Sequence, residues 1–261
     1  EDPEGKAKNS NDAEEEENIP IASQDAKSVF TQDPAVTGEK WITIDLADYG
    51  TDNAIYLAWN GFDAYDIDIV TNSTPRSNAE HARVFAAKHG ISLSHIIYDA
   101  TAGRYFNDYI PEAIPYISAA KPMGIYALSA CSVKDLCYLR LCQMIKRGEF
   151  TMSDNVAEKV YTHQNLKYRV TVENEFLEEC SVVRFSETGT GRKRLWSKKE
   201  MNRNLGKGRS MDLLDPCAMR MYPCMNMEYG TEIEQGFSAS ERESNEVKPG
   251  AISIYSRTLW G

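Results

Sequence analysis

The sequence contains no long apolar run and no C-x-x-C cysteine pair. No window of its 261 residues approaches the roughly 18 consecutive apolar residues of a membrane span, and its N-terminus does not resemble a signal peptide. We therefore expect neither a membrane protein nor an exported one. The six cysteines lack the spacing of a zinc site or a redox motif. We interpret them as reduced thiols of an intracellular protein.

Several catalytic motifs are also missing. The chain contains no G-x-x-x-x-G-K-[ST] phosphate loop, no G-x-S-x-G nucleophile elbow and no H-E-x-x-H zinc-binding helix. Its four histidines are scattered along the sequence, which argues against a triad built around histidine. The chemistry of the chain must therefore be sought among its carboxylates and basic residues.

The charge is distributed unevenly along the chain. The net charge is −10, yet residues 184–209 carry nine basic and two acidic residues, and residues 1–28 carry nine acidic residues and three lysines. The overall charge argues against a protein that coats nucleic acid, but the basic segment leaves a polyanionic partner open. We expect residues 1–34 to be an acidic linker or disordered arm, residues 35–229 to form the folded domain, and residues 230–261 to form a tail.

The hydrophobic pattern of the central region changes type along the chain. We expect strands at Trp41–Leu46, Ala54–Trp59, Tyr65–Val70, Ser94–Tyr98 and near Tyr116–Ala119. We expect helices at Ser77–His89, near Tyr105–Ala113, at Ser132–Lys146, at Asn165–Cys180 and near Leu213–Tyr222. Residues 181–185 and 194–197 should form a β-hairpin. Three antiparallel strands followed by alternating strands and helices indicate an α/β fold with a mixed β-sheet covered by helices.

Four aspartates stand where apolar elements begin or end. Asp45 and Asp99 each end an apolar strand, and Asp212 and Asp215 are spaced i, i+3 at the start of the last helix. Each one alone is most simply a helix cap or a turn residue. A buried carboxylate is costly unless it is paired or binds a metal, so together they predict a site at one edge of the sheet. Ligation by oxygen atoms alone suits Mg²⁺ or Mn²⁺.

Three blocks of sequence resemble the motifs of one enzyme family. In the first, Ile42–Ile55, a strand ends on Asp45, a Gly-x-Asp turn follows, and the chain returns as a strand. The second is Ile97–Gly103, and the third is Leu195–Glu200 followed by Gly208–Asp215. Their order and spacing resemble the nuclease domain of tailed-bacteriophage large terminase subunits, over about residues 38–225. The family usually has Pro where this chain has Met211, and Ala where it has Pro216.

The resemblance implies a ribonuclease-H-like fold with helices on both faces of the sheet and a β-hairpin excursion. It implies that Asp45 bridges two divalent cations, Mg²⁺ or Mn²⁺, and that Asp99 and Asp212 complete the site. Asp215 either joins Asp212 or replaces it. Asp48 and Asp52 would then be turn residues or residues that support the ligands. The implied activity is two-metal hydrolysis of concatemeric double-stranded viral DNA during genome packaging, in the host cell cytoplasm.

The resemblance also implies partners. They are an ATPase motor domain, whose phosphate loop this sequence lacks, the small terminase subunit and the portal; a membrane is not among them. The basic segment precedes the third acidic block and would lie along DNA phosphates. Its candidate DNA-binding residues are Arg192, Lys193, Arg194, Lys198, Lys199 and Arg203.

Three other functions stay open on the sequence. The first is another nuclease of the same fold, a junction resolvase or a transposase-like enzyme, which the cleavage of branched DNA would distinguish. The second is a non-catalytic packaging or docking module, whose aspartates only terminate strands and which would not bind divalent metals. The third is an actin-like or sugar-kinase-like ATPase, which requires later glycine-rich phosphate loops that we do not find.

Overall fold

A six-stranded mixed sheet forms the centre of the molecule. The computed structural model describes residues 20–31, 38–46, 53–101, 103, 105–163, 168–205 and 211–229. The sheet has the order β5-β4-β1-β2-β3-β6. Its strands are β1 (Lys40–Asp45), β2 (Ala54–Asn60), β3 (Asp63–Val70), β4 (Ile96–Asp99), β5 (Ile114–Tyr116) and β6 (Thr151–Met152). β1, β2 and β3 pair antiparallel, whereas β4 runs parallel to both β1 and β5, and β6 runs parallel to β3.

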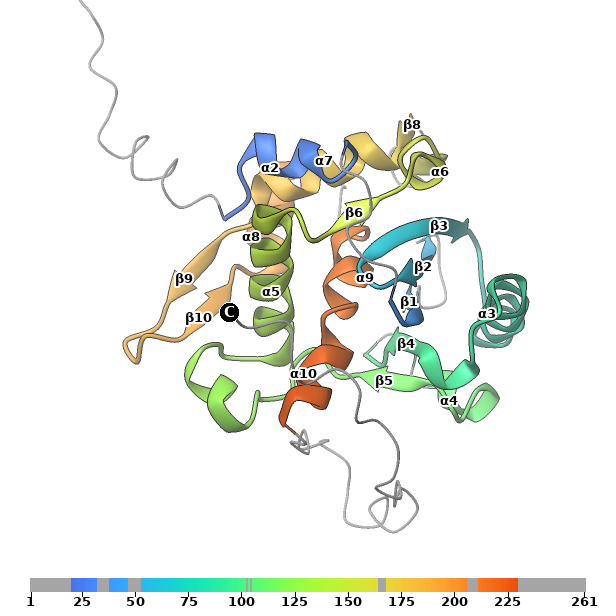
Figure 1. Ribbon diagram of the computed structural model, residues 1–261, viewed down its shortest axis with the longest axis horizontal. Coiled ribbons are helices and arrows are strands. Elements are labelled where there is room, and N and C mark those ends of the chain that lie inside the picture. Colours follow the sequence, from blue (N-terminus) through green and yellow to red (C-terminus); the bar gives the residue numbers. More distant parts are fainter. Residues whose placement is uncertain are drawn as a thin grey trace, which may run out of the picture.

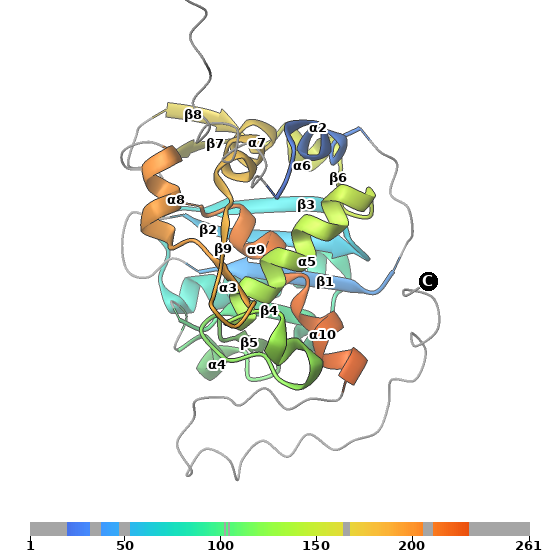
Figure 2. The same cartoon turned by 90° about the vertical axis from the view of Figure 1, so that its left-hand side faces the viewer.

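Helices cover both faces of this sheet (Figure 1 and Figure 2). α3 (Pro75–His89) and α4 (Phe106–Tyr109) lie on one face. The helices on the other side are α2 (Ser23–Ser28), α5 (Val133–Arg147), α7 (Val172–Val182) and α9 (Leu214–Met219). Side chains of β2 alternate between the two cores, with Tyr56 facing α3 and Leu57 facing the opposite side. This alternation leaves β2 buried on both faces.

The remaining elements lie around this core. They are α6 (Asp154–Ala157), β7 (Val160–His163), β8 (Tyr168–Thr171), β9 (Phe185–Glu187), β10 (Lys193–Leu195), α8 (Lys198–Leu205), α10 (Tyr222–Tyr229) and short 3-10 helices at Leu93–His95 and Gly124–Leu128. β7 pairs with β8 and β9 with β10, in two separate hairpins. None of the helices among these described residues has the length and apolar character needed to cross a membrane.

The structure confirms the mixed α/β fold, the opening three-stranded meander and the β9–β10 hairpin. Ser132, the first residue of the expected helix Ser132–Lys146, caps α5, since its hydroxyl accepts a hydrogen bond from the backbone N–H of Asp135 at 3.1 Å. Pro216 lies in the first turn of α9, where proline is tolerated. The expected last helix is, however, two helices, because the chain turns at Arg220 and Met221 between α9 and α10.

Three expectations are wrong in part. The helix expected from residue 165 begins only at Val172, because Tyr168–Thr171 pairs with β7 as a strand. Residues 198–205, for which we expected neither a helix nor a strand, form the helix α8. The expected acidic arm contains α2, whose Ala26 is buried with the flanking Ile21 and Val29, so residues 20–31 are packed into the core. The expected turn residues Asp48 and Asp52, the turn at 208–210 and the tail at 230–261 lie outside the described residues.

Candidate active site

The four predicted aspartates meet at one edge of the sheet. β1 and β4 are parallel neighbours with Ile44 opposite Tyr98, so their last residues, Asp45 and Asp99, end side by side. Asp212 precedes α9 and Asp215 lies in its first turn, and α9 packs across β1 and β4. Each of the other three carboxylates is close enough to Asp45 to raise its pKa. The structure therefore brings together residues separated by up to 170 positions in the sequence.

Asp45 and Asp215 respond to this crowding in opposite ways. Burial raises the pKa of Asp45 well above its ordinary value, and the neighbouring carboxylates, Asp215 first, raise it further. Burial also acts on Asp215, which is 8% exposed, but nearby cations lower its pKa below the ordinary value. Of this pair, Asp45 is therefore the carboxylate that is more easily protonated, and Asp215 is the one that ionises more easily.

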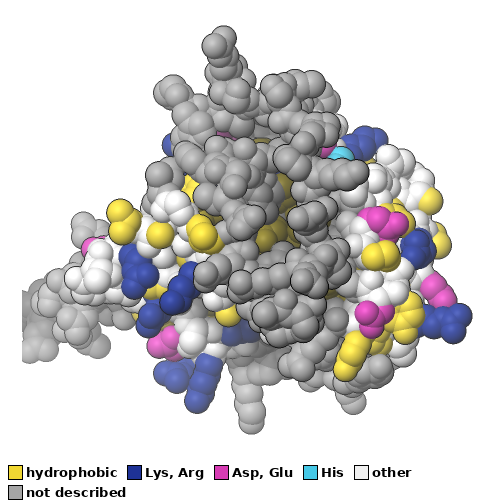
Figure 3. Space-filling model, turned by 90° about the horizontal axis from the view of Figure 1, so that it is seen from below, with side chains coloured by type: hydrophobic (Ala, Val, Ile, Leu, Met, Phe, Trp, Pro, Cys, Tyr) yellow, Lys and Arg dark blue, Asp and Glu magenta, His cyan; other side chains and the backbone are white. Residues whose placement is uncertain are grey.

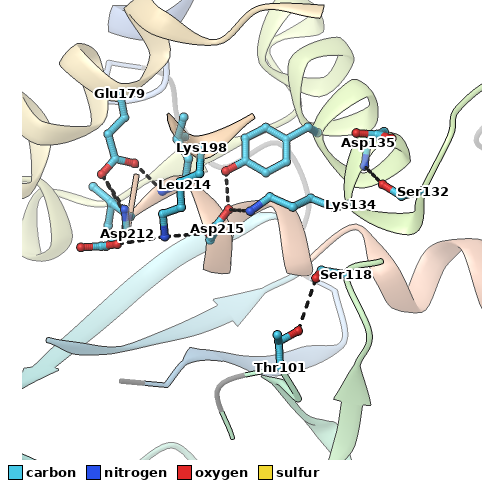
Figure 4. A network of polar contacts seen from close by, with 12 residues as sticks. Thr101, Ser118, Ser132, Lys134, Asp135, Glu179, Lys198, Asp212, Leu214 and Asp215 are labelled. Carbon is cyan, nitrogen blue, oxygen red and sulfur yellow. Dashed lines mark hydrogen bonds and ion pairs between the residues drawn. The ribbon is translucent and has the colours of Figure 1, made fainter. Parts of the chain in front are cut away.

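Two lysines supply the compensating charge (Figure 4). The ammonium of Lys134 lies 2.7 Å from Oδ1 of Asp215. The ammonium of Lys198 lies 3.4 Å from Oδ1 of Asp212 and 3.7 Å from Oδ2 of Asp215. Burial lowers the pKa of Lys198, but the surrounding carboxylates outweigh it and raise the pKa above the ordinary value. Lys198 is thus held charged among the aspartates, and its expected role as a DNA phosphate contact stays a prediction.

Glu179 fixes the segment that carries Asp212. Its side chain, on α7, is buried at 1% exposure. Its Oε1 accepts hydrogen bonds from the backbone N–H groups of Asp212 and Leu213, at 3.0 and 3.1 Å, and its Oε2 accepts one from Leu214 at 2.7 Å. These N–H groups lie at the N-terminus of α9 and have no acceptor within the helix. The Glu179 side chain, which belongs to α7, therefore caps the N-terminus of α9. The entry to α9 is thereby held against α7 (Figure 4).

The turn after β4 orients Asp99. Oδ1 of Asp99 accepts a hydrogen bond from the backbone N–H of Thr101 at 2.7 Å, and its carbonyl oxygen accepts one from Gly103 at 2.9 Å. A Cβ atom on Gly103 would lie 2.3 Å from Cδ1 of Leu46 and 3.0 Å from the carbonyl oxygen of Asp99. Only glycine fits this position without displacing the residue that follows Asp45. The glycine of the second sequence block therefore has a steric role.

The basic hairpin is attached to the first turn of α5. The backbone N–H of Leu195, in β10, donates to Oδ1 of Asp135 at 2.9 Å, and the backbone of Lys193 bonds to Ser129 and Cys131. Lys193 and Arg194 are exposed, and Lys193 pairs with Glu187 at 2.5 Å. Lys199 and Arg203 are exposed on α8. Figure 3 shows lysine and arginine side chains gathered on the side of the molecule where this hairpin lies.

The donor chemistry of the site fits a hard divalent cation, because four carboxylates converge and two of them share a cation, the ammonium of Lys198. The residues that would hold the metal are Asp45, Asp99, Asp212 and Asp215. In the arrangement seen here, no group of three acidic, histidine or cysteine residues among those described is spaced to hold a metal ion. A metal would therefore require the carboxylates to close further and Lys198 to give up its position.

Sequence reasoning missed Lys134, Glu179 and also Tyr138, whose hydroxyl donates a hydrogen bond to Oδ1 of Asp215. Each acts on an aspartate 33 to 81 residues away, and no local pattern encodes such a contact. A local signal did exist for α8: Ser197 and Glu200 have the spacing of a capping box. In the structure the Ser197 hydroxyl accepts from the backbone N–H of Glu200, and the Glu200 carboxylate accepts from that of Ser197.

Known structures share this fold. No protein-family model matches the sequence, and no curated protein matches it. The nuclease domain of the large terminase subunit gp2 of bacterial virus Sf6 superposes with a TM-score of 0.60 at 15% identity, over 78% of this chain and 98% of that one. A mutant form of that domain with calcium gives a TM-score of 0.61 at 14% identity and the same coverage. Another, with manganese and beta-thujaplicinol, gives 0.60 at 14%. The chain therefore has the ribonuclease-H-like fold of a phage large-terminase nuclease domain.

Proposed function

We propose that the chain is a divalent-metal-dependent endonuclease that hydrolyses phosphodiester bonds of double-stranded DNA. One observation carries the proposal: Asp45, Asp99 and the Asp212–Asp215 pair, from three separate segments, converge at one sheet edge in this fold. Acidic residues that only ended their strands would be more stable apart, because the negative charges repel one another, as the raised pKa of Asp45 reflects. A cluster of this kind is stable only with cations, which the structure supplies as lysines.

The proposed cofactor is a pair of Mg²⁺ or Mn²⁺ ions held by the four aspartates. The chemistry that such a pair supplies when bound is activation of a water molecule and stabilisation of the leaving 3′-oxygen. The chain contributes the placement of the ligands. Glu179 holds Asp212 in position, the turn at Gly103 orients Asp99, and Lys134 keeps Asp215 ionised. Lys198 balances the charge of the cluster until a cation arrives.

The proposed substrate is concatemeric viral DNA, cut in the host cytoplasm during genome packaging. Support comes from the terminase domain that shares the fold and from the exposed cations beside the site. Arg192, Lys193 and Arg194 on the hairpin, with Lys199 and Arg203 on α8, would contact phosphates without reading sequence. The proposed partners are an ATPase motor domain, the small terminase subunit and the portal.

A second candidate is a non-catalytic packaging or docking module with the same fold. It is favoured by the lysine that stands among the aspartates and by the absence, among the described residues, of three ligands spaced for a metal. In such a protein the lysines would replace the metals permanently. The two candidates differ in a single measurable property, the response to divalent cations.

The test is cleavage of supercoiled plasmid by the purified chain with Mn²⁺, Mg²⁺ or EDTA. We expect nicked and linear products with metal and none with EDTA. Asp45→Asn should abolish cleavage, whereas the exposed Asp154→Asn on α6 should leave it intact. Among the third ligands we expect Asp212→Asn to be more damaging than Asp215→Asn. A wild-type chain that neither cuts nor gains thermal stability with metal would favour the docking module.

A further inference from the structure

Lys134 occupies an unusual position for a lysine. It is the second residue of α5, where its backbone N–H donates to the carbonyl oxygen of Ser118 at 3.0 Å. The N-terminus of a helix carries partial positive charge, so an ammonium there is unfavourable for the helix itself. Its ammonium reaches Oδ1 of Asp215 at 2.7 Å, and its side chain is only 27% exposed. The placement of this lysine therefore serves the carboxylate and not the helix.

Tyr138, one helical turn later, reaches the same atom. Its side chain is 1% exposed, and its hydroxyl donates to Oδ1 of Asp215 at 2.5 Å. The ammonium of Lys134 also lies 5.6 Å from the centre of the Tyr138 ring, which holds the two side chains together on one face of α5. One oxygen of Asp215 is thus bound by two donors from a single rigid helix (Figure 4).

The other oxygens of the third acidic block are committed differently. Oδ2 of Asp215 faces Lys198, at 3.7 Å. The Asp212 carboxylate is 26% exposed, and its closest cation among the described residues is the same Lys198, at 3.4 Å from Oδ1. Asp212 is fixed through its backbone by Glu179, whereas Asp215 is fixed through its carboxylate by α5. The two aspartates are therefore not equivalent.

We infer that Lys134 and Tyr138 are positioning residues, which hold Asp215 by Oδ1 so that only Oδ2 is presented to a cation. Asp215 then offers a single oxygen in a fixed direction, whereas the Asp212 carboxylate meets Lys198 through Oδ1. This inference rests on the proposed function, because it assigns roles within the metal site. It adds a helix, α5, that none of the three sequence blocks contains.

The test compares Lys134→Met, Lys134→Arg and Tyr138→Phe with the control Lys146→Met, an exposed residue in the last turn of α5. Three quantities are measured: the melting temperature in EDTA, the gain in melting temperature on adding MnCl₂, and the plasmid cleavage rate at saturating Mn²⁺. Lys134→Met should lower the first, because Asp215 loses its nearest counter-charge. It should increase the second, because Mn²⁺ then replaces that charge, and lower the third at least tenfold, because Asp215 is no longer fixed.

Lys134→Arg should recover most of the cleavage rate, and Tyr138→Phe should lose part of it with a smaller change in the EDTA melting temperature. The control should match wild type in all three measurements. If the lysine is only structural, Lys134→Met will melt earlier with an unchanged Mn²⁺ gain and an unchanged rate, and the inference is overturned. Should that variant not fold, Tyr138→Phe decides by the same criteria. A wild-type chain without any Mn²⁺ gain would instead refute the metal site itself.

Discussion

Replacement of Glu179 tests how the structure holds Asp212 in place. Glu179→Ala leaves three backbone N–H groups without their acceptor: those of residues 213 and 214, which are buried, and that of residue 212, which is partly buried. Each unsatisfied buried donor costs about 1–3 kcal/mol. Water entering the vacated space will satisfy some of them, and removal of the carboxylate relieves its repulsion with Glu175 and Asp212, which raise its pKa. We therefore expect a net loss near the lower end of the sum, about 3 kcal/mol.

Glu179→Gln separates the geometry of the cap from its charge. The amide oxygen can still accept from Asp212 and Leu213, but the amide nitrogen then faces the N–H of Leu214, donor against donor. One bond is lost, so we expect about 1–2 kcal/mol of destabilisation. The alanine variant must therefore be the less stable of the two.

The assay is chemical denaturation in EDTA, supported by melting temperatures. For a domain of this size 1 kcal/mol corresponds to about 2–4 °C, so Glu179→Ala should melt about 6–12 °C below wild type. Glu173→Ala, at an exposed position on the same helix, should change stability by less than about 0.5 kcal/mol. The reasoning is refuted if the alanine variant equals wild type, or if glutamine costs more than alanine.

Three further predictions concern the aspartates, the turn and the hairpin. The folded-state pKa of Asp45 is raised above its ordinary 3.8, so in EDTA its contribution to stability is fully present below pH 3.8 and is lost as the pH rises through the raised pKa. Asp45→Asn should remove this loss, so the variant should become increasingly more stable than wild type as the pH rises. A difference in stability that does not grow with pH contradicts the prediction. Gly103→Ala should lower the free energy of unfolding by about 1–3 kcal/mol, because the new methyl group displaces Leu46. Denaturation measures this loss, and plasmid nicking should show slower cleavage. Unchanged stability and cleavage would mean that the turn can relax. Replacing the hairpin cations Arg192, Lys193 and Arg194 by alanine should weaken the binding of duplex DNA in Ca²⁺ equally for every DNA sequence. The slope of log affinity against log salt should become less steep by up to roughly 0.9 per lost phosphate contact. An unchanged slope would mean that the DNA binds to another part of the surface.

The sequence is sufficient for the parts of the fold that depend on local patterns. The apolar run Ala54–Trp59 predicts a strand, which the structure buries on both faces, and Ser132 marks the start of α5, because caps and periodicity act over a few residues. The acidic cluster is predictable because a carboxylate that ends an apolar strand is costly to bury without a cation or another partner. Asp45 and Asp99 are recognisable in this way.

The errors arise where a distant contact decides the local structure. Residues 20–31 are poor in large apolar side chains, yet Ile21 and Val29 are buried with α7 and α5, which the sequence of the arm does not indicate. The strand at Tyr168–Thr171 exists because it pairs with β7, whereas its sequence alone joins it to the helix that follows. The sequence does not distinguish Lys134 from an ordinary exposed lysine, because its ion pair with Asp215 depends on the packing of α9 against α5.

Asp135 links the two halves of the proposed machinery through one turn of helix. Its backbone N–H is held by Ser132, and its carboxylate holds Leu195 at the base of the hairpin, 60 residues away. The preceding residue, Lys134, holds Asp215. The first turn of α5 therefore connects the hairpin, through Asp135 and Leu195, to the carboxylates, through Lys134 and Asp215. No loop lies between these two contacts. Any shift of β10 must be taken up in the first turn of α5, within one residue of the lysine that sets the direction of Asp215.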